Sequence, residues 1–299
     1  MESTTILSII IVNWNTKDLL EQCLQAIVLH IGDLHYEVVV VDNGSTDGSA
    51  QMVREYYPNV TLIENQENTG FAKANNQAIR LSSGRYILLL NSDAFLSPNA
   101  TQRMIQIMED DPSIGIAGAM LEYPDGRIQV SHGSLPDFRS ELLSLFGLDK
   151  FHEPVRSSEE YFETGTVNGA GMLIRKSLID RIGLLDESFF MFSEEVDLCN
   201  RCHKAGAKVV HVPSAIIIHL EAGSTGQTVQ RVIRLYKGKL HYFHKYYGSK
   251  AEARLRRAML VSAKVKSIVY SFIRLFSLGK FKKDEFWRSV SNELLNSIE

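Results

Sequence analysis

The sequence predicts an α/β fold in which helices flank a mostly parallel sheet. Short unbroken apolar runs, typical of strands buried on both faces, alternate along the first third of the chain with segments of helical spacing. A polar cluster directly follows three of these runs. With 299 residues, of which 44% are hydrophobic, the chain can bury a large core and still carry an extension. We therefore expect one large α/β domain followed by further helices.

The first 97 residues contain four strand-like runs separated by connecting segments. The strands are expected at 6–12, 37–41, 60–63 and 86–90, and helices at 19–27 and 71–81. A helical crossover returns the chain so that successive strands point the same way. Neither a Gly-x-Gly-x-x-Gly motif nor a Walker motif follows the first strand, which leaves dinucleotide-binding and P-loop interpretations without support.

The polar clusters stand where predicted strands end. Asn13 and Asn15 follow the first strand, Asp42 follows the second, and Asn91 and Asp93 follow the fourth. Ligands of open α/β sheets bind beyond the carboxyl ends of the strands, so all three clusters could meet one ligand. Each cluster alone is also consistent with turn chemistry. Asp93 could hold Mg²⁺ or Mn²⁺ carried on a substrate diphosphate, or could cap the following turn.

The second half of the chain continues the alternation less regularly. A helix ends near residue 108, and strands are expected at 114–119, 128–130, 166–175, 208–212 and 215–218. His219 ends the last of these strands. A neutral imidazole can bind a metal, although a lone histidine is more often structural.

An acidic cluster begins a predicted helix directly after an apolar run. Its members are Glu194, Glu195 and Asp197, and Ser193 is a candidate N-cap. Acids in a first helical turn interact favourably with the helix dipole, which explains one or two of the three. A carboxylate beside apolar residues and other carboxylates has a raised proton affinity, which suits a general base.

Residues 248–299 are predicted to form a basic amphipathic helical tail. Residues 245–283 carry a net charge of +10, so the rest of the chain carries −13. Three charges interrupt the apolar stretch of the tail and argue against a spanning helix: Lys264, Lys266 and Arg274. Basic residues beside aromatic ones favour a helix lying on an anionic membrane surface. The alternative is a helix packed on the catalytic domain or on the partner in a homodimer.

The same features bear on compartment and on other partners. The N-terminus lacks the basic region of a signal peptide, and three cysteines provide no disulfide framework. We therefore expect a cytoplasmic protein, peripheral at the cytoplasmic face of the membrane. The tail is rich in aliphatic residues and no recognised nucleic-acid-binding module accompanies it, so nucleic acid is not an expected partner.

The ordered set of motifs resembles the family 2 glycosyltransferases of the GT-A fold, particularly their rhamnosyltransferase-like branch. The matching segments are 9–15, 40–49, 67–75, 89–93, 168–175, 192–198 and 212–219. The resemblance covers about residues 6–247. It implies a GT-A domain at 1–247, with a nucleotide-sugar-binding half at 1–97 and an acceptor and catalytic half at 98–247. The tail at 248–299 lies outside it.

The resemblance implies a nucleotide-sugar site at the strand ends. Asp42 would accept a hydrogen bond from the pyrimidine of the donor. Further residues would line or border the nucleotide-sugar: Asn13, Asn15, Asn43, Asn68, Gly70, Lys73, Asn75 and Ser92.

The resemblance also implies a metal site and a base. Asp93 corresponds to the last residue of the family's Asp-x-Asp motif, with Asn91 in place of the first aspartate, and His219 would complete the coordination of Mg²⁺ or Mn²⁺. Glu194 and Glu195 correspond to the family's Glu-Asp pair, which makes Glu195 the expected catalytic base. Asp197 stays open as the base or as a supporting acceptor contact.

The implied reaction is an inverting transfer of a sugar from a nucleotide diphosphate-sugar, with dTDP-rhamnose the first candidate. The acceptor would be a hydroxyl of a glycan or of a lipid-diphosphate-linked sugar. Two alternatives stay open: a nucleotide-sugar-binding protein without turnover, and a sugar-phosphate nucleotidyltransferase. The latter would normally carry a glycine-rich, Arg- or Lys-bearing loop after the first strand, unlike the segment 13–16.

Overall fold

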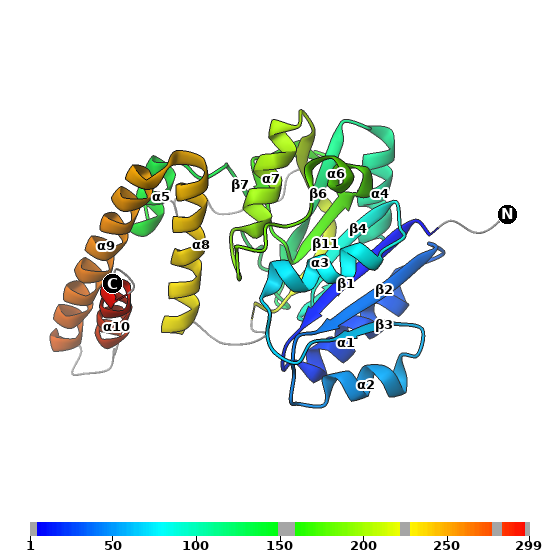
Figure 1. The fold of residues 1–299 in the computed structure, drawn as a ribbon, viewed down its shortest axis with the longest axis horizontal. Coiled ribbons are helices and arrows are strands. Elements are labelled where there is room, and N and C mark those ends of the chain that lie inside the picture. The colour runs from blue at the N-terminus through cyan, green and yellow to red at the C-terminus, as the bar shows by residue number, and fades with distance from the viewer. Residues whose placement is uncertain (1–4, 149–158, 222–227, 277–282, 297–299) are drawn as a thin grey trace. The chain divides into compact units, whose positions relative to one another are not determined.

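The computed structural model describes residues 5–148, 159–221, 228–276 and 283–296. The chain forms two units (Figure 1). Unit 1 comprises residues 1–135, 154–190 and 194–224, and unit 2 comprises 136–153, 191–193 and 225–299. Residues 225–247 thus group with the C-terminal helices. The functional division at residue 247 stays a prediction.

Unit 1 is built on a sheet that has nine strands within the described residues, in the order β3-β2-β1-β4-β10-β6-β11-β5, with β8 paired to β11. The strands are β1 (Leu7–Asn13), β2 (Tyr36–Asp42), β3 (Thr61–Glu64), β4 (Tyr86–Asn91), β5 (Ala94–Leu96), β6 (Ile114–Glu122), β8 (Phe162–Glu163), β10 (Gly171–Arg175) and β11 (Lys208–His219). A second, two-stranded sheet joins β7 (His132–Gly133) to β9 (Thr166–Val167).

The sheet is mixed, with a parallel half that matches the sequence prediction. Strands β1 to β4 pair in parallel. Strand β10 runs antiparallel between β4 and β6, and β11 runs parallel to β6 but antiparallel to β5 and β8. The predicted α/β fold with a mostly parallel sheet is confirmed for this half. The antiparallel β10 could not be read from periodicity, because a buried strand has the same apolar pattern in either direction.

Three strand predictions differ from the structure. The strand expected at 166–175 is divided into β9, in the two-stranded sheet, and β10, in the large sheet. The runs at 208–212 and 215–218 form one strand, β11, whose register against β6 shifts between Val212 and Ile216. Pro213 lies in this interruption and has no N–H to give to a ladder, which explains why the strand is irregular there but does not end. The strand expected at 128–130 is reduced to a single bridge between Glu122 and Ile128.

Helices cover both faces of the sheet in unit 1. They are α1 (Lys17–His30), α2 (Ser49–Tyr56), α3 (Phe71–Leu81), α4 (Ala100–Asp110), α6 (Lys176–Ile182) and α7 (Glu194–Lys204). In β1, Ile9 and Ile11 belong to the apolar cluster that contains Leu24 of α1, whereas Ile10 belongs to the cluster that contains Ala78 of α3. Because alternate strand residues are buried on opposite faces, the apolar run of β1 is continuous.

Unit 2 contains the predicted C-terminal helices. They are α5 (Phe138–Leu145), α8 (Val229–Tyr247), α9 (Ser249–Phe276) and α10 (Lys283–Asn296). Helix α9 packs against α5, α8 and α10, and its Leu255, Met259 and Ala263 are buried. The Ser262 hydroxyl donates a hydrogen bond to the carbonyl oxygen of Leu145 at 2.7 Å. None of the helices in the described ranges is long and apolar enough to cross a membrane.

Candidate active site

The strand ends that carry polar residues lie side by side. In the parallel ladder Asn13 pairs with Asp42, and Val12 pairs with Asn91. The expectation that the polar clusters share one edge of the sheet is therefore confirmed. This edge brings together residues that are far apart in the sequence.

Asp42 is held in a fixed orientation at this edge. Its Oδ1 accepts a hydrogen bond from Asn13 Nδ2 at 3.0 Å, and its Oδ2 accepts one from the backbone N–H of Ser45 at 3.0 Å. Asp42 and Asn13 are both buried. Because each carboxylate oxygen can accept more than one hydrogen bond, Asp42 keeps acceptor capacity for a ligand. Asn15 is exposed, and its Oδ1 accepts from the N–H of Thr46 at 2.8 Å, which joins the loops after β1 and β2.

Asn43 organises the loop before α3. Its Oδ1 accepts hydrogen bonds from the N–H of Thr69 and from Asn65, both at 3.0 Å, and its Nδ2 donates to Asn68 at 3.1 Å and to the carbonyl of Gly70 at 3.3 Å. The polar groups of this buried side chain are therefore used within the protein. The structure gives Asn43 and Asn68 a role in shaping the loop.

The candidates on α3 have different surroundings. Asn75 is buried and donates to the carbonyl of Phe71 at 2.9 Å, whereas Lys73 is exposed. Hydrogen bonds from Asn76 and Arg80, with a smaller effect of the Lys73 charge, lower the pKa of Glu187. Gly70 has a φ of 87°, and a Cβ there would lie 2.5 Å from the carbonyl oxygen of Phe190. A side chain is therefore excluded at this position, at the start of α3.

Asp93 and His219 face each other at the same edge. His219 Nε2 lies 3.4 Å from Asp93 Oδ1 and 3.4 Å from Asn91 Nδ2. The antiparallel pairing of β5 and β11 sets His219 opposite Ala94, and the N–H of Leu220 donates to the carbonyl of Asp93 at 3.1 Å. Both side chains are buried.

A carboxylate and an imidazole form a suitable donor pair for a divalent cation. Two ligands at adjacent corners of an octahedral ion stand about 3 Å apart, close to the separation of these two atoms. In the described part of the chain, no group of three or more His, Cys, Asp or Glu side chains could hold a metal ion. A cation at this position would take its other ligands from substrate phosphates and water, as Mg²⁺ usually does.

A second link joins Asn13 to Ser92, the residue next to Asp93. The hydroxyls of Thr16 and Ser92 lie 2.9 Å apart, and Thr16 donates to Asn13 Oδ1 at 2.6 Å. All three side chains are buried. Thr16 was missed by sequence reasoning, because a threonine at the start of a helix reads as a cap.

The two glutamates begin α7 beside this edge. A Cβ at Gly169 would lie 3.8 Å from Glu195 Cβ, and the N–H of Asn91 donates to the neighbouring carbonyl of Ala170 at 3.4 Å. The loop at 168–170 therefore borders both Glu195 and the end of β4. Burial, together with the charge of Glu195, raises the pKa of Glu194 well above 4.5.

The backbone before α7 is strained. Phe192 and Ser193 have φ values of 71° and 74°, a region that residues other than glycine rarely occupy. Ser193 directly precedes α7 but lacks the extended backbone that is usual at an N-cap, so its N-cap role stays a prediction. Such strain persists only where surrounding contacts hold it in place.

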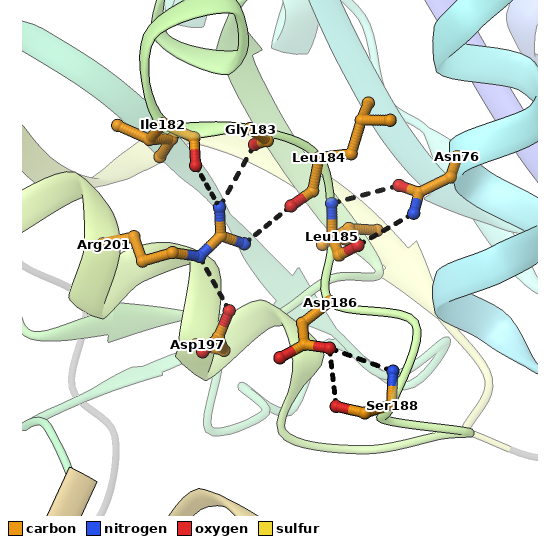
Figure 2. A network of polar contacts seen from close by, with 9 residues as sticks. All are labelled: Asn76, Ile182, Gly183, Leu184, Leu185, Asp186, Ser188, Asp197 and Arg201. Atoms are coloured by element: carbon orange, nitrogen blue, oxygen red, sulfur yellow. Dashed lines mark hydrogen bonds and ion pairs between the residues drawn. The ribbon is translucent and has the colours of Figure 1, made fainter. Parts of the chain in front are cut away.

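Asp197 is buried and has a separate partner, Arg201. Its Oδ2 accepts a hydrogen bond from Arg201 Nε at 2.8 Å, and the Asp197 side chain is 0% exposed (Figure 2). The same guanidinium donates to the carbonyls of Ile182, Gly183 and Leu184 at 2.8, 3.1 and 2.9 Å. Figure 2 shows these bonds converging on Arg201 from the loop after α6. Sequence reasoning missed Arg201, although its i,i+4 spacing from Asp197 on a helix is the signal of such a pair.

The comparisons with known proteins decide the family. The family model described as "Glycosyl transferase family 2" matches residues 8–183, which is more than half of the chain. The chain belongs to glycosyl transferase family 2. It is therefore a glycosyltransferase by family, and the sequence-based family assignment is confirmed.

Curated relatives of this glycosyltransferase include a rhamnosyltransferase and a polysaccharide synthase. The chain is 29% identical over 243 residues to the N-acetylglucosaminyl-diphospho-decaprenol L-rhamnosyltransferase of Mycobacterium tuberculosis, covering 75% of this chain and 79% of the relative. It is 25% identical over 270 residues to the poly-beta-1,6-N-acetyl-D-glucosamine synthase of Staphylococcus aureus, covering 89% of this chain and 62% of that protein.

Solved structures confirm the GT-A-type fold. The mannosyltransferase PcManGT of Pyrobaculum calidifontis, in complex with GDP-Man and Mn²⁺, aligns with a TM-score of 0.62 and 20% identity over 98% of this chain and 85% of that chain. TarS of S. aureus aligns with a TM-score of 0.55 and 16% identity over 98% of this chain and 81% of that chain. At these identities the likeness concerns the fold alone.

Proposed function

We propose that this glycosyltransferase moves a sugar from a nucleotide diphosphate-sugar to a hydroxyl of a lipid-diphosphate-linked acceptor, with inversion at the anomeric carbon. dTDP-rhamnose is the first candidate donor, supported by the similarity to a rhamnosyltransferase whose name specifies a decaprenyl diphosphate acceptor. The observation that carries the proposal is the edge of the sheet where Asp42, Asp93, His219 and the loop beside Glu195 come together.

The roles follow from the chemistry of the side chains. Asp42 accepts a hydrogen bond from the donor base, and Asp93 with His219 holds Mg²⁺ or Mn²⁺. When bound, the ion neutralises charge that develops on the leaving diphosphate. A solved structure of similar fold contains Mn²⁺ together with a nucleotide-sugar, which supports a divalent ion.

Glu195 is the proposed base. It takes the proton of the acceptor hydroxyl while the hydroxyl oxygen attacks the anomeric carbon from the face opposite the diphosphate. The bond from the anomeric carbon to the diphosphate oxygen breaks, and the electron pair leaves with the nucleoside diphosphate. One displacement therefore inverts the configuration. A positioned base typically contributes about 10²–10⁴-fold to such a step.

The neighbouring acids support this assignment. Asp197 is committed to Arg201, which makes it a structural residue in the proposal. Glu194 is buried, and its raised pKa favours the protonated form. A proton held on Glu194 removes charge repulsion against Glu195.

We place the tail at an anionic membrane surface, which brings the enzyme to a lipid-linked acceptor. One face of α9 carries a row of exposed apolar side chains, which we call the α9 apolar row: Val261, Val265, Ile268, Val269, Phe272 and Ile273, 40% to 61% exposed. Their spacing repeats every three or four residues, so they share one helical face. The exposed cations Lys250, Arg257 and Lys264 lie on or beside the same face.

This combination fits a lipid surface better than a second copy of the chain. Apolar side chains enter the boundary of the acyl chains, and each nearby cation adds about 1 kcal/mol of attraction to an anionic leaflet. Two copies of the α9 apolar row would bring like charges together, which opposes a homodimer through this face.

Vesicle flotation tests the membrane proposal. The protein should float with vesicles containing phosphatidylglycerol and stay unbound with phosphatidylcholine alone. The double variant Ile268→Ser, Phe272→Ser should lose flotation, whereas Leu29→Ser, which changes a more exposed apolar residue of α1, should not. Equal flotation of both variants, or a concentration-dependent dimer that the double variant abolishes, would contradict the proposal.

A turnover assay tests the reaction itself. The protein is mixed with Mn²⁺, a panel of nucleotide diphosphate-sugars and a polyprenyl-diphosphate-linked sugar. Release of nucleoside diphosphate, with inverted anomeric configuration of the product by NMR, is the expected result. Donor binding without turnover would favour the binding-protein alternative. Diphosphate release from a nucleoside triphosphate and a sugar phosphate would favour a nucleotidyltransferase.

A further inference from the structure

We propose that Gln129 is a positioning residue that fixes the ring orientation and the tautomer of His219. The proposal rests on the metal site proposed above and assigns it a residue that no motif of the sequence marks. Gln129 is buried, and two hydrogen bonds join it to His219, which is 90 residues away. Its Nε2 donates to the backbone carbonyl of His219 at 2.5 Å, and its Oε1 lies 2.9 Å from His219 Nδ1.

The direction of these bonds follows from what each group can do. A backbone carbonyl only accepts hydrogen bonds, so the amide NH₂ of Gln129 must face the carbonyl of His219. The amide oxygen then faces Nδ1, and since an amide oxygen only accepts, Nδ1 must carry the proton. In a neutral imidazole this leaves the lone pair on Nε2.

With this tautomer Nε2 accepts a hydrogen bond from Asn91 Nδ2 at 3.4 Å, on the side of the ring where Asp93, the other proposed metal ligand, lies. Nε2 lies 3.4 Å from Asp93 Oδ1. Two acceptor atoms at this distance repel each other unless a positive charge lies between them. The two hydrogen bonds with Gln129 therefore leave Nε2 of His219 with a lone pair that can bind a cation. They exclude the tautomer in which Nε2–H would donate a hydrogen bond to Asp93.

Local structure explains how Gln129 reaches His219. The turn at 123–127 closes with the N–H of Tyr123 donating to the carbonyl of Arg127 at 2.8 Å, and the N–H of Gln129 donates to the carbonyl of Leu121 at 2.8 Å. The segment after this turn therefore runs back along β6, whose other neighbour at this end is β11, paired with β6 up to Ile218. Gln129 therefore acts on the site through His219.

Mn²⁺ binding tests the proposal with a readout other than activity. The dissociation constant for Mn²⁺, in the presence of a nucleoside diphosphate, is measured by electron paramagnetic resonance. Gln129→Leu should weaken Mn²⁺ binding about 10–100-fold, the usual effect of losing the residue that orients a metal-binding histidine. Gln106→Leu, at an exposed glutamine of α4, should leave it unchanged. Nucleotide affinity without metal should be the same in all three proteins.

The outcomes separate this proposal from the proposed function. If the wild type binds Mn²⁺ and Gln129→Leu binds it equally well, the role of Gln129 is rejected and the metal site stands. If the wild type binds no Mn²⁺ with nucleotide, the metal site and the role of Gln129 both fail.

A second measurement needs no variant. Nitrogen-15 NMR of the metal-free wild type at alkaline pH, where imidazoles are neutral, reports which ring nitrogen of His219 is protonated. The proposal requires Nδ1–H, and a predominant Nε2–H form would overturn it even if Gln129→Leu fails to fold.

Discussion

Thr16 and Ser92 join two polar clusters through hydroxyl groups 2.9 Å apart, although 76 residues separate them in the sequence. Thr16 has one hydroxyl proton, which it donates to Asn13, so Ser92 must be the donor to Thr16. Asn13 in turn donates to Asp42. A chain of hydrogen bonds, each donating towards the next residue, therefore runs from Ser92 to Asp42, the carboxylate proposed to bind the pyrimidine of the donor.

Replacement of Thr16 tests this connection. Thr16→Val keeps the shape of the side chain but leaves the buried Asn13 Oδ1 and Ser92 hydroxyl without their partner. We expect a loss of about 1–3 kcal/mol in the free energy of unfolding, measured with urea, and a higher KM for the donor. Thr61→Val, on the exposed side of β3, is the control and should change neither. An unchanged KM in Thr16→Val would mean that this chain of bonds does not position Asp42.

Asp197 is expected to matter for folding more than for the reaction. Asp197→Asn leaves the mostly buried Arg201 without a charged partner, which should cost roughly 3 kcal/mol of stability. The folded variant should keep kcat within about tenfold of the wild type, less than a positioned base typically contributes. Asp125→Asn, at an exposed ion pair with Arg127, is the control for stability. A variant that is stable but has lost nearly all of its kcat would instead make Asp197 the base.

The raised pKa of Glu194 predicts that the stability of the protein depends on pH. Burial and the charge of Glu195 raise this pKa above the ordinary 4.5, so the folded state holds a proton that the unfolded state has released. The contribution of protonated Glu194 to the free energy of unfolding is fully present below pH 4.5 and is lost as the pH rises through the raised pKa. Glu194→Gln removes this loss, so its unfolding free energy should exceed that of the wild type by an amount that grows with pH. Parallel pH profiles of the two proteins would contradict the raised pKa.

Gly238 of α8 is expected to control the strained segment before α7. A Cβ on Gly238 would lie 2.4 Å from the carbonyl oxygen of Phe192. Alanine in a helix is otherwise favoured over glycine by about 1 kcal/mol. Gly238→Ala should nevertheless lower kcat, because Phe192 and Ser193 lead directly into Glu194 and Glu195. Lys237→Ala, at the exposed neighbouring position, is the control. If Gly238→Ala is more stable than the wild type and has the same kcat, the backbone at Phe192 and Ser193 does not control the reaction.

The parallel half of the sheet could be predicted because its signals are local. Unbroken apolar runs mark β1, β2 and β4, and polar residues mark their ends. The meeting of Asn13 with Asp42 then follows from parallel pairing alone. Strand β10 shows the limit, since its direction depends on partners that are distant in the sequence.

At the proposed metal site, too, residues with a local sequence signal could be predicted and residues that act through distant contacts could not. The two candidate ligands of the site were identified through a resemblance between motifs. Gln129 was missed because it contacts His219 across 90 residues and has no periodic or motif signal of its own. Asp197 and Arg201 carry a local signal, the i,i+4 spacing, but that spacing does not reveal that the pair is buried against the carbonyls of the loop after α6.

The most direct test of the central claim is the rate of nucleotide release by Glu195→Gln in the presence of donor, acceptor and Mn²⁺. Glutamine keeps the size of the side chain but cannot take a proton from the acceptor. The rate should fall by about 10²–10⁴-fold while the affinity for the nucleotide stays the same. Release at the rate of the wild type would show that Glu195 is not the base.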